Sequence, residues 1–231
     1  MIESRYADGD YARQNPTWHS EDSPWKANQI VQLIDQNKLS LRTICEVGCG
    51  AGEVLRQLQL SLSPECEFWG YELSPDAFEL CRGKANARLH FKLADVVTEQ
   101  VSFDLLLLID VVEHVPDYIG FLRAVRGKGR YKVIHIPLDI SVQSVLRAAP
   151  ILKSRTEVGH LHYFTKETAL GTLKDCGYEI LDWFFTAGTV DLPAQSLKSW
   201  AAKLPRKVMF ALHRELAVRL LGGFSLLVLA R

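Results

Sequence analysis

A glycine-rich run between a short apolar segment and a predicted helix constrains this chain more than any other feature. Residues 41–47 (LRTICEV) have the composition of a buried strand, and residues 52–61 are expected to form a helix. Glycine lets the backbone turn sharply and lets a ligand approach without a Cβ in the way, and helix N-termini favour anionic groups. A strand, a ligand-binding turn and a helix are therefore predicted around Glu46-Val47-Gly48-Cys49-Gly50-Ala51-Gly52.

Predicted strands and helices alternate through the first part of the chain, which implies a parallel sheet with helices on both faces. Ser74 and Pro75 are suited to the first positions of one helix, and Thr165 to the cap of another. Further strands are expected at 68–73, 89–95, 103–110, 131–138, 178–185 and 224–230, and helices at 25–38, 75–84, 117–126, 141–153, 165–176 and, for the most part, 195–221.

Acidic residues end three of the predicted strands after the glycine run. They are Glu72, Asp95 and Asp110, and with Glu46 they converge on the carboxyl edge of the sheet, where open α/β sheets bind ligands. Glu72 lies 20 residues after Gly52, a position from which a carboxylate can accept hydrogen bonds from ribose hydroxyls.

The spacing of the glycines discriminates between nucleotide ligands. A dinucleotide fingerprint would place its third glycine at position 53, where this chain has Glu53. An acid beside a pyrophosphate is repulsive, whereas acids suit a ligand that carries a sulfonium, an amine and a ribose. The pattern favours S-adenosylmethionine as the cofactor over a dinucleotide.

These motifs resemble those of the class I S-adenosylmethionine-dependent methyltransferases. EVGCGAG resembles their first motif, YELSP the second and LADV the third. IDVVEHVPD and GHLHYFT (159–165) resemble the small-molecule subgroup that includes ubiquinone-biosynthesis O-methyltransferases. The resemblance covers roughly 40–185 and the last strand. It implies a Rossmann-like α/β fold with a seven-stranded, mostly parallel sheet whose last strand is antiparallel.

The resemblance also implies one methyltransferase domain over 1–231 and a role for most of the residues above. Residues 1–39 would be an arm and helix, 40–140 the cofactor-binding half, and 141–231 the acceptor side, with a helical insertion at about 192–222. Glu72 would hold the ribose, Leu73 would lie against the adenine, and Asp95 would meet the adenine amino group. Val96 would add a backbone contact, and Asp110 would stand near the methionine end. The expected cofactor-binding residues are Glu46, Gly48, Gly50, Gly52, Glu72, Leu73, Asp95, Val96, Asp110, Trp18 and Lys26.

The N-terminal arm supplies the last two of these residues. Two tryptophans in a polar segment, Trp18 and Trp25, need a surface to cover, which favours a lid over the cofactor. His19 or Lys26 would then meet the methionine carboxylate. An arm packed on the domain surface, or a dimer contact, is the alternative.

Three histidines are candidates for a general base: His114, His160 and His162. Such a base would help if the acceptor is a hydroxyl, although many methyltransferases need no base. A purely structural role for these histidines is equally open. Oxygen is the expected acceptor atom. The Asn/Asp-Pro-Pro-Tyr/Phe motif of adenine and amide N-methyltransferases is replaced here by Ile109-Asp110-Val111-Val112.

A metal site is considered and not expected. Asp110, Glu113 and His114 have suitable donor types, and the resemblance associates this patch with a divalent ion in some relatives. Asp110 is also the residue best placed to face the cofactor, and zinc would want a further histidine or cysteine, which is not adjacent in sequence. We expect no stoichiometric ion.

Composition narrows the remaining classes. With 27 Lys and Arg against 27 Asp and Glu, general nucleic-acid binding is disfavoured. Five cysteines without a C-x-x-C pair, and no apolar leader or span, suggest a cytoplasmic protein. Residues 194–221 form a basic amphipathic segment, which we expect to pack on its own domain; contact with a membrane surface or an anionic lipid-linked acceptor is the less favoured alternative.

Two other functions fit parts of this pattern. A non-catalytic cofactor-binding module that regulates a partner would have the same fold and pocket. A nucleotide-dependent oxidoreductase is disfavoured by Glu53. The small-molecule acceptor itself is not identified by any motif.

Overall fold

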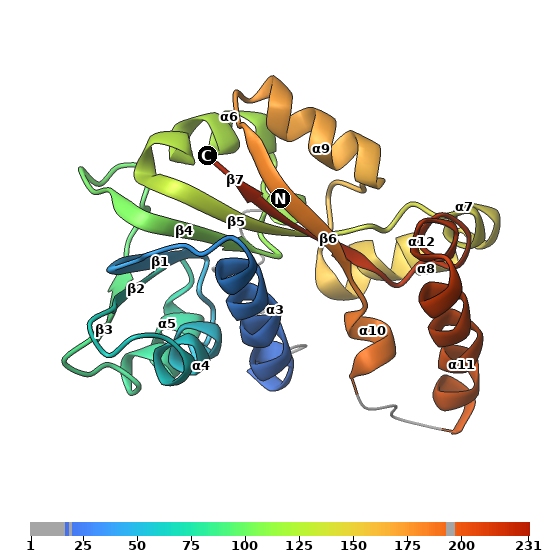
Figure 1. Cartoon of the computed structure of the whole chain (residues 1–231), viewed down its shortest axis with the longest axis horizontal. Helices are drawn as coiled ribbons and strands as arrows, with labels where there is room; N and C mark the ends of the chain where they lie inside the picture. Colours follow the sequence, from blue (N-terminus) through green and yellow to red (C-terminus); the bar gives the residue numbers. More distant parts are fainter. Residues whose placement is uncertain (1–16, 19, 193–196) are drawn as a thin grey trace.

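A seven-stranded sheet organises the part of the chain that the computed structural model describes, which comprises residues 17, 18, 20–192 and 197–231 (Figure 1). The strand order is β3-β2-β1-β4-β5-β7-β6, and β7 runs antiparallel to both of its neighbours. The predicted sheet with an antiparallel last strand is therefore confirmed. The strands are β1 Thr43–Val47, β2 Glu67–Glu72, β3 Leu89–Leu93, β4 Phe103–Ile109, β5 Gly129–Pro137, β6 Ile180–Thr186 and β7 Ser225–Ala230.

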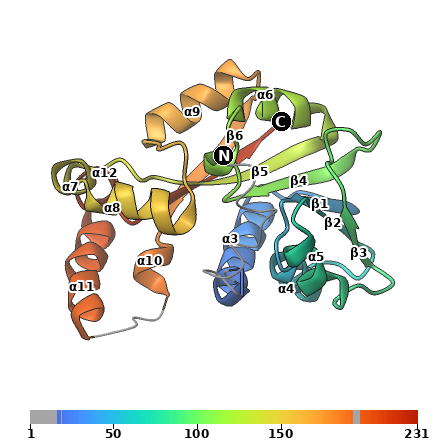
Figure 2. The ribbon, with the colours of Figure 1, turned by 180° about the vertical axis from the view of Figure 1, so that it is seen from behind.

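Helices cover both faces of the sheet, as Figures 1 and 2 show from opposite sides. On one face lie α3 (Ser23–Gln36), α4 (Glu53–Ser61) and α5 (Pro75–Arg82), and on the other lie α6 (Tyr118–Val125) and α9 (Lys166–Asp175). Short 3₁₀ turns connect some of the elements: η1 (Ser20–Asp22), η2 (Val112–His114) and η3 (Arg126–Lys128).

The central strand β4 shows why the sheet has two separate apolar layers. Leu105 and Leu107 belong to the core cluster shared with α3 and α4, whereas Leu106 and Leu108 belong to the cluster shared with α6 and α9. All four side chains are fully buried. Because successive strand residues point to opposite faces, a strand buried on both sides must be apolar at every position.

Local capping follows the sequence in the predicted places. The Ser74 hydroxyl accepts a hydrogen bond from the Ala77 N–H, with Pro75 in the first turn of α5. The Thr165 hydroxyl accepts one from the Thr168 N–H at the start of α9. Each cap satisfies a donor that the helix itself leaves unpaired.

The helix predicted over 141–153 is broken into two, α7 (Val142–Arg147) and α8 (Ala149–Lys153). Ala148 adopts a positive φ of 56° at the break. Pro150, two residues on, has no N–H to donate, and its ring would clash with a helical carbonyl four residues earlier. A π-helical turn, η4 (Ser154–Val158), follows.

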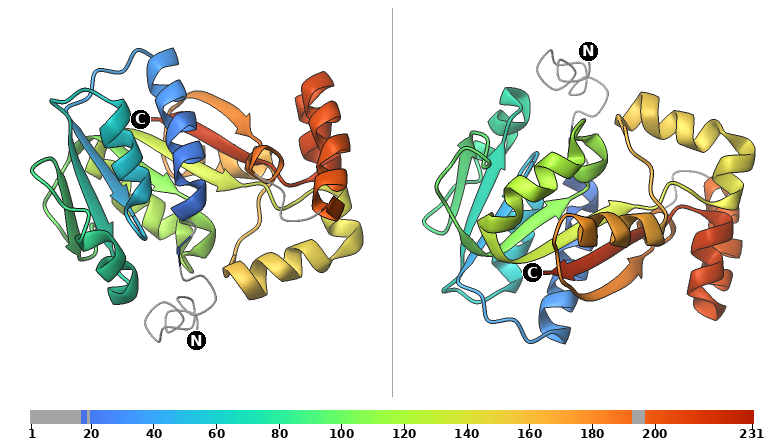
Figure 3. Two further views of the ribbon diagram at one scale, coloured as in Figure 1. Left: turned by 90° about the horizontal axis from the view of Figure 1, so that it is seen from below. Right: turned by 90° about the horizontal axis from the view of Figure 1, so that it is seen from above.

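The segment after β6 is also divided. A short helix, α10 (Gly188–Asp191), precedes α11 (Leu197–Leu212), and α12 (Arg214–Leu221) follows after a break at His213. Helices α11 and α12 pack against each other, and α12 packs against α7. Figure 3 shows these helices at one end of the molecule, beyond the helices that cover the sheet. No helix in the described part of the chain is long and apolar enough to cross a membrane.

Candidate functional site

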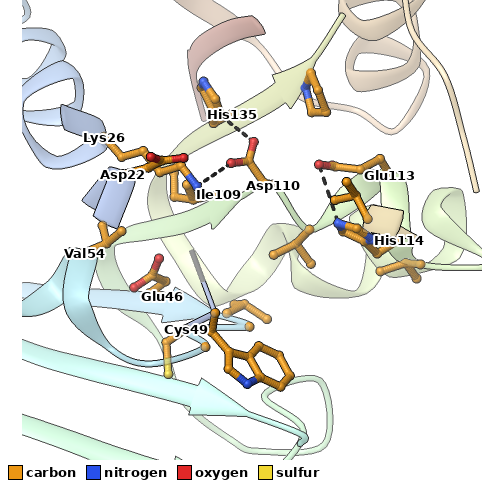
Figure 4. A pocket seen from close by; sticks show the side chains of 18 of the residues that line it. Asp22, Lys26, Glu46, Cys49, Val54, Ile109, Asp110, Glu113, His114 and His135 are labelled. Atoms are coloured by element: carbon orange, nitrogen blue, oxygen red, sulfur yellow. Dashed lines mark hydrogen bonds and ion pairs between the residues drawn. The ribbon is translucent and has the colours of Figure 1, made fainter. Parts of the chain in front are cut away.

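A cavity of about 960 Å³ lies at the carboxyl edge of the sheet. Figure 4 shows labelled side chains from its lining, which comes from the ends of the strands and the loops after them. Gly52 and His162 do not line it. The predicted site residues that do are Trp18, Lys26, Glu46, Gly48, Gly50, Glu72, Leu73, Asp95, Val96, Asp110, His114 and His160.

The glycine loop needs its glycines for two different reasons. Gly48, Gly50 and Gly52 all have positive φ angles, of 65°, 53° and 71°. Gly48 and Gly50 face the cavity, where their backbone can approach a ligand. A Cβ on Gly52 would lie 2.6 Å from the ring of Phe91 and 2.9 Å from the Cβ of Cys81. Gly52 thus allows close packing at the start of α4, and its geometry does not favour ligand contact.

Glu72 links the end of β2 to the glycine loop. Its Oε2 accepts a hydrogen bond of 2.8 Å from the Gly50 N–H, and its Oε1 accepts from the N–H groups of Leu73 and Ser74, also at 2.8 Å. A carboxylate has about four acceptor positions, so roughly one is left for a ligand hydroxyl. Glu72 holds the loop in shape in addition to facing the cavity.

The segments after β2 and β3 contribute two apolar residues, Leu73 and Val96, and one acid, Asp95, to the cavity lining. The Leu73 side chain is 68% exposed although it lines the cavity, whereas Val96 is buried. A flat aromatic ligand would cover the exposed leucine. Asp95 is exposed and accepts a hydrogen bond of 2.8 Å from the Val97 N–H, which leaves its second oxygen for a ligand donor.

Glu46 is a buried acid with an unused acceptor. It is 3% exposed, and no hydrogen-bond partner reaches its Oε2. Burial raises the pKa of Glu46 to about 8, against the attraction of the Lys26 ammonium. A buried polar atom of this kind favours a ligand that brings a donor or a positive charge.

Lys26, Asp110 and His135 form one ionic cluster, marked by dashed lines in Figure 4. The Lys26 Nζ lies 2.8 Å from Asp110 Oδ2, and His135 Nδ1 lies 2.5 Å from Asp110 Oδ1. Burial opposes ionisation of Asp110, but His135 and Lys26 outweigh it and hold the pKa of Asp110 well below its usual range. This arrangement differs from the predicted contact between Lys26 and a ligand carboxylate, because the lysine already neutralises an acid of the protein.

Sequence reasoning missed His135. The signal for it was a histidine near the end of an otherwise apolar strand, in YKVIHIPL. Its Nε2 lies 2.8 Å from the Thr186 hydroxyl, so the ring is held from both sides. The position predicted for His19 lies outside the described residues.

Two of the three predicted histidines meet at the cavity wall. His160 Nδ1 lies 2.7 Å from Asp139 Oδ2, and the rings of His160 and His114 are 5.1 Å apart. His162 is turned elsewhere, with Nε2 3.0 Å from the Val115 carbonyl. Asp139 was not singled out from the sequence, although it lies two residues after the end of β5, as Asp95 lies two residues after the end of β3.

Glu113 is fully buried beside these histidines, and neither of its oxygens has a hydrogen-bond partner. Burial, with the nearby Asp110 charge, raises the pKa of Glu113 well above its ordinary value. Donor atoms of Glu113, His114 and His160 lie within 4.8 Å of one another. The donor atoms that lie together therefore differ from the set considered from the sequence. Asp110 pairs with Lys26, and His160 joins Glu113 and His114 from a distant loop.

The overall charge of the lining is strongly acidic. Eight carboxyl groups line the cavity, and Lys26 is the one Lys or Arg among the described lining residues. Such a lining repels a pyrophosphate and suits a ligand with cationic and hydroxyl groups. The residues present therefore fit S-adenosylmethionine, the cofactor favoured by the sequence.

Comparison with known proteins agrees with this geometry. Residues 45–128 match the model of a family described as a methyltransferase domain. Over these residues the chain is similar to a methyltransferase domain. The matched residues span β1 to the start of β5, which is the half of the cavity that carries the glycine loop and Glu72.

One curated relative is norajmaline N-methyltransferase of Rauvolfia serpentina, 26% identical over 106 residues. The match covers 42% of this chain and 36% of that enzyme, so the chain spans about a third of the length of the curated relative it matches.

Solved structures share the fold of this chain over most of its length. Magnesium protoporphyrin IX methyltransferase from Synechocystis PCC 6803, with bound S-adenosylhomocysteine (SAH), has a TM-score of 0.60 and 14% identity, covering 90% of this chain and 82% of its own. The plantazolicin methyltransferase BpumL with SAH has a TM-score of 0.64 and 15% identity, covering 99% and 92%. At these identities the likeness concerns the fold.

Proposed function

We propose that this protein is an S-adenosylmethionine-dependent methyltransferase that acts on a hydroxyl oxygen of a small molecule. The observation that carries the proposal is the acidic cavity at the carboxyl edge of the sheet, lined by Glu72, which is hydrogen-bonded to the glycine loop. Bound S-adenosylmethionine supplies a methyl group made electrophilic by its sulfonium.

The cofactor half of the cavity has a partner for each part of that molecule. The remaining acceptor position of Glu72 would take a ribose hydroxyl. Leu73 and Val96 would lie against the adenine, and the second oxygen of Asp95 would meet its amino group. The unpartnered oxygen of Glu46 would accept a hydrogen bond from the methionine amine. The backbone of Gly48 and Gly50 would lie around the methionine end of the cofactor.

The acceptor half has a base and a residue that orients it. With Nδ1 of His160 bonded to Asp139, the ring presents Nε2 as the nitrogen that can take a proton from an acceptor hydroxyl. Glu113 is kept neutral by its burial and can donate a hydrogen bond to the acceptor. Alignment of acceptor and methyl group supplies much of the remaining acceleration.

Oxygen is proposed as the acceptor atom on two grounds. The Asp139–His160 pair serves an acceptor that must lose a proton, and the segments IDVVEHVPD and GHLHYFT resemble ubiquinone-type O-methyltransferases. The Asp139–His160 pair also argues against a non-catalytic module, which has no use for an oriented base.

Isothermal titration calorimetry tests the cofactor half of this proposal. We expect S-adenosylmethionine and SAH to bind, and NAD and NADP to show no comparable heat. Tighter binding of a dinucleotide would overturn the assignment. Transfer of a labelled methyl group to cell extracts then separates an enzyme from a binding module, which would bind the cofactor and label nothing.

A further inference from the structure

The four helices α7, α8, α11 and α12 carry most of the exposed apolar side chains of the described molecule. Nine of its sixteen exposed large apolar residues lie there. Leu146 and Leu212 are the extremes, at 80% and 81% exposed. We call these four helices the apolar end. Their exposed large apolar residues are Val142, Val145, Leu146, Leu152, Leu204, Val208, Leu212, Leu216 and Leu220.

The exposed residues follow rows along the helices. Leu204, Val208 and Leu212 are spaced four apart on α11, and Leu216 and Leu220 are spaced four apart on α12. Residues with this spacing share a helix face. A row of exposed leucine and valine on one face costs solubility unless something covers it. This differs from the sequence-based expectation that the segment packs its apolar face on its own domain.

The apolar end carries a net positive charge, unlike the chain as a whole. Residues 142–158 and 203–220 contain eight Lys and Arg and two Glu, in a chain whose total charge is zero. Both glutamates are ion-paired, Glu157 with Lys153 and Glu215 with Lys166 and Arg219. Arg147, Lys207 and Arg214 are exposed, and none of them has an ion pair with a described residue.

We propose that the apolar end docks on an anionic lipid surface, with its leucines in the interface and its Lys and Arg side chains among the headgroups. Helices with basic side chains beside exposed apolar rows bind membranes in this way. A second copy of the chain is a poorer occupant, because a symmetric contact would set one basic surface against another.

The apolar end also adjoins the acceptor side of the cavity. Leu192 follows α10, and Gly223 and Phe224 join α12 to β7, and all three line the cavity. A membrane-borne acceptor would therefore reach the cavity from the docked side. This last step depends on the proposed function, whereas the docking does not.

Vesicle sedimentation tests the docking without any enzymatic activity. We expect the full chain to bind vesicles made of equal parts phosphatidylcholine and phosphatidylglycerol, and to bind phosphatidylcholine vesicles far less. Added salt should weaken the binding. Failure to bind the anionic vesicles would overturn the proposal, whatever the cofactor measurements show.

Matched variants locate the surface. Leu212→Ser should reduce the bound fraction on anionic vesicles by about tenfold, because a leucine leaves the interface. Leu60→Ser is the control, since Leu60 is 70% exposed on α4, away from the apolar end. Lys207→Glu should weaken binding, and Lys174→Glu, on the exposed side of α9, should not.

Two results would contradict the docking surface. Equal losses in Leu212→Ser and Leu60→Ser would show that the apolar end is not the contact. Binding of polyglutamate as tight as that of the anionic vesicles, unaffected by Leu212→Ser, would point to an acidic protein partner instead. Circular dichroism confirms that each variant is folded.

Discussion

The cofactor half and the acceptor half of the cavity are built in different ways. The cofactor half consists of strand ends and the turns that follow them, and Glu46, Glu72 and Asp95 each lie within two residues of a strand. The proposed acceptor half draws His114 from the short turn η2, Asp139 from two residues after β5 and His160 from the segment after η4. The cofactor half thus comes from the first three strands, whereas two of the three residues in the acceptor half come from turns, where tertiary contacts such as the pair of His160 with Asp139 hold them in place. A fold of this kind can therefore keep its cofactor while its acceptor changes.

The largest expected effect is on the rate of methyl transfer, which should depend on a residue of the acceptor half. His160→Ala should lower the rate of methyl transfer by roughly 10²–10⁴-fold, because it removes the general base, and leave cofactor affinity unchanged. Turnover of labelled cofactor with an acceptor from extracts, measured across pH, checks it. His162→Ala is the control, since His162 does not line the cavity. A His160→Ala enzyme with the wild-type rate and pH profile would remove the base from the mechanism.

Cofactor affinity should respond next most strongly, and only to the cofactor half. Glu72→Ala removes a charge-assisted hydrogen bond worth about 1.5–3 kcal/mol and also the partner of the Gly50 N–H. We expect at least a roughly tenfold loss of affinity for SAH by calorimetry. Glu65→Ala, in an exposed turn, is the matched control. Unchanged affinity in Glu72→Ala would mean that the cofactor binds elsewhere.

A smaller effect is expected in the protons that are released when the cofactor binds, and we expect these protons to come from Glu46. Its pKa of about 8 lies above the ordinary 4.5, so the ligand-free folded protein holds a proton between these values and loses stability as pH rises through them. A cationic amine beside Glu46 favours the charged form, so binding near neutral pH should release up to one proton. Calorimetry in buffers of different ionisation enthalpy measures this release, and Glu46→Gln should abolish it. Release that persists in Glu46→Gln would assign the proton to another group.

The smallest expected effect is that of metal removal. The donor group of Glu113, His114 and His160 lies in the acceptor half, so excess chelator should leave SAH affinity unchanged. We also expect no stoichiometric ion in elemental analysis, because a His160 nitrogen bound to a metal could not take a proton from the acceptor as proposed. One equivalent of a divalent ion, lost in Glu113→Ala, would show that this group is a metal site.

The two halves also differ in how far the sequence predicts them. The strand–loop–helix run and the acids at strand ends are local signals, and the cavity lining includes Glu46, Glu72, Asp95 and Asp110 as expected. The pairing of Asp139 with His160, and of Lys26 with Asp110, depends on loops and helices that meet only in the folded chain. No spacing rule relates residues 21 or 84 positions apart when neither pair lies on one helix or strand.

The positions at which helices break were also not predicted from the sequence. One helix was expected over 141–153, whereas the chain breaks at Ala148, whose φ is positive, just before Pro150. The reversal at His213 was likewise hidden in a continuous helical pattern. Both breaks lie in the apolar end, so the region that the sequence predicted least well is also the one with the most exposed leucines.

The segregation of charge gives the protein an electrical polarity that its composition conceals. Its formal charge is zero and its pI is about 7, yet residues 142–158 and 203–220 have six more basic than acidic residues, so the rest of the chain has six more acidic than basic residues. A neutral molecule with this charge distribution has a large electric dipole. The electric field of a charged surface therefore orients it before contact. It should be retained on cation and anion exchangers alike at neutral pH, each resin holding a different end of the same molecule.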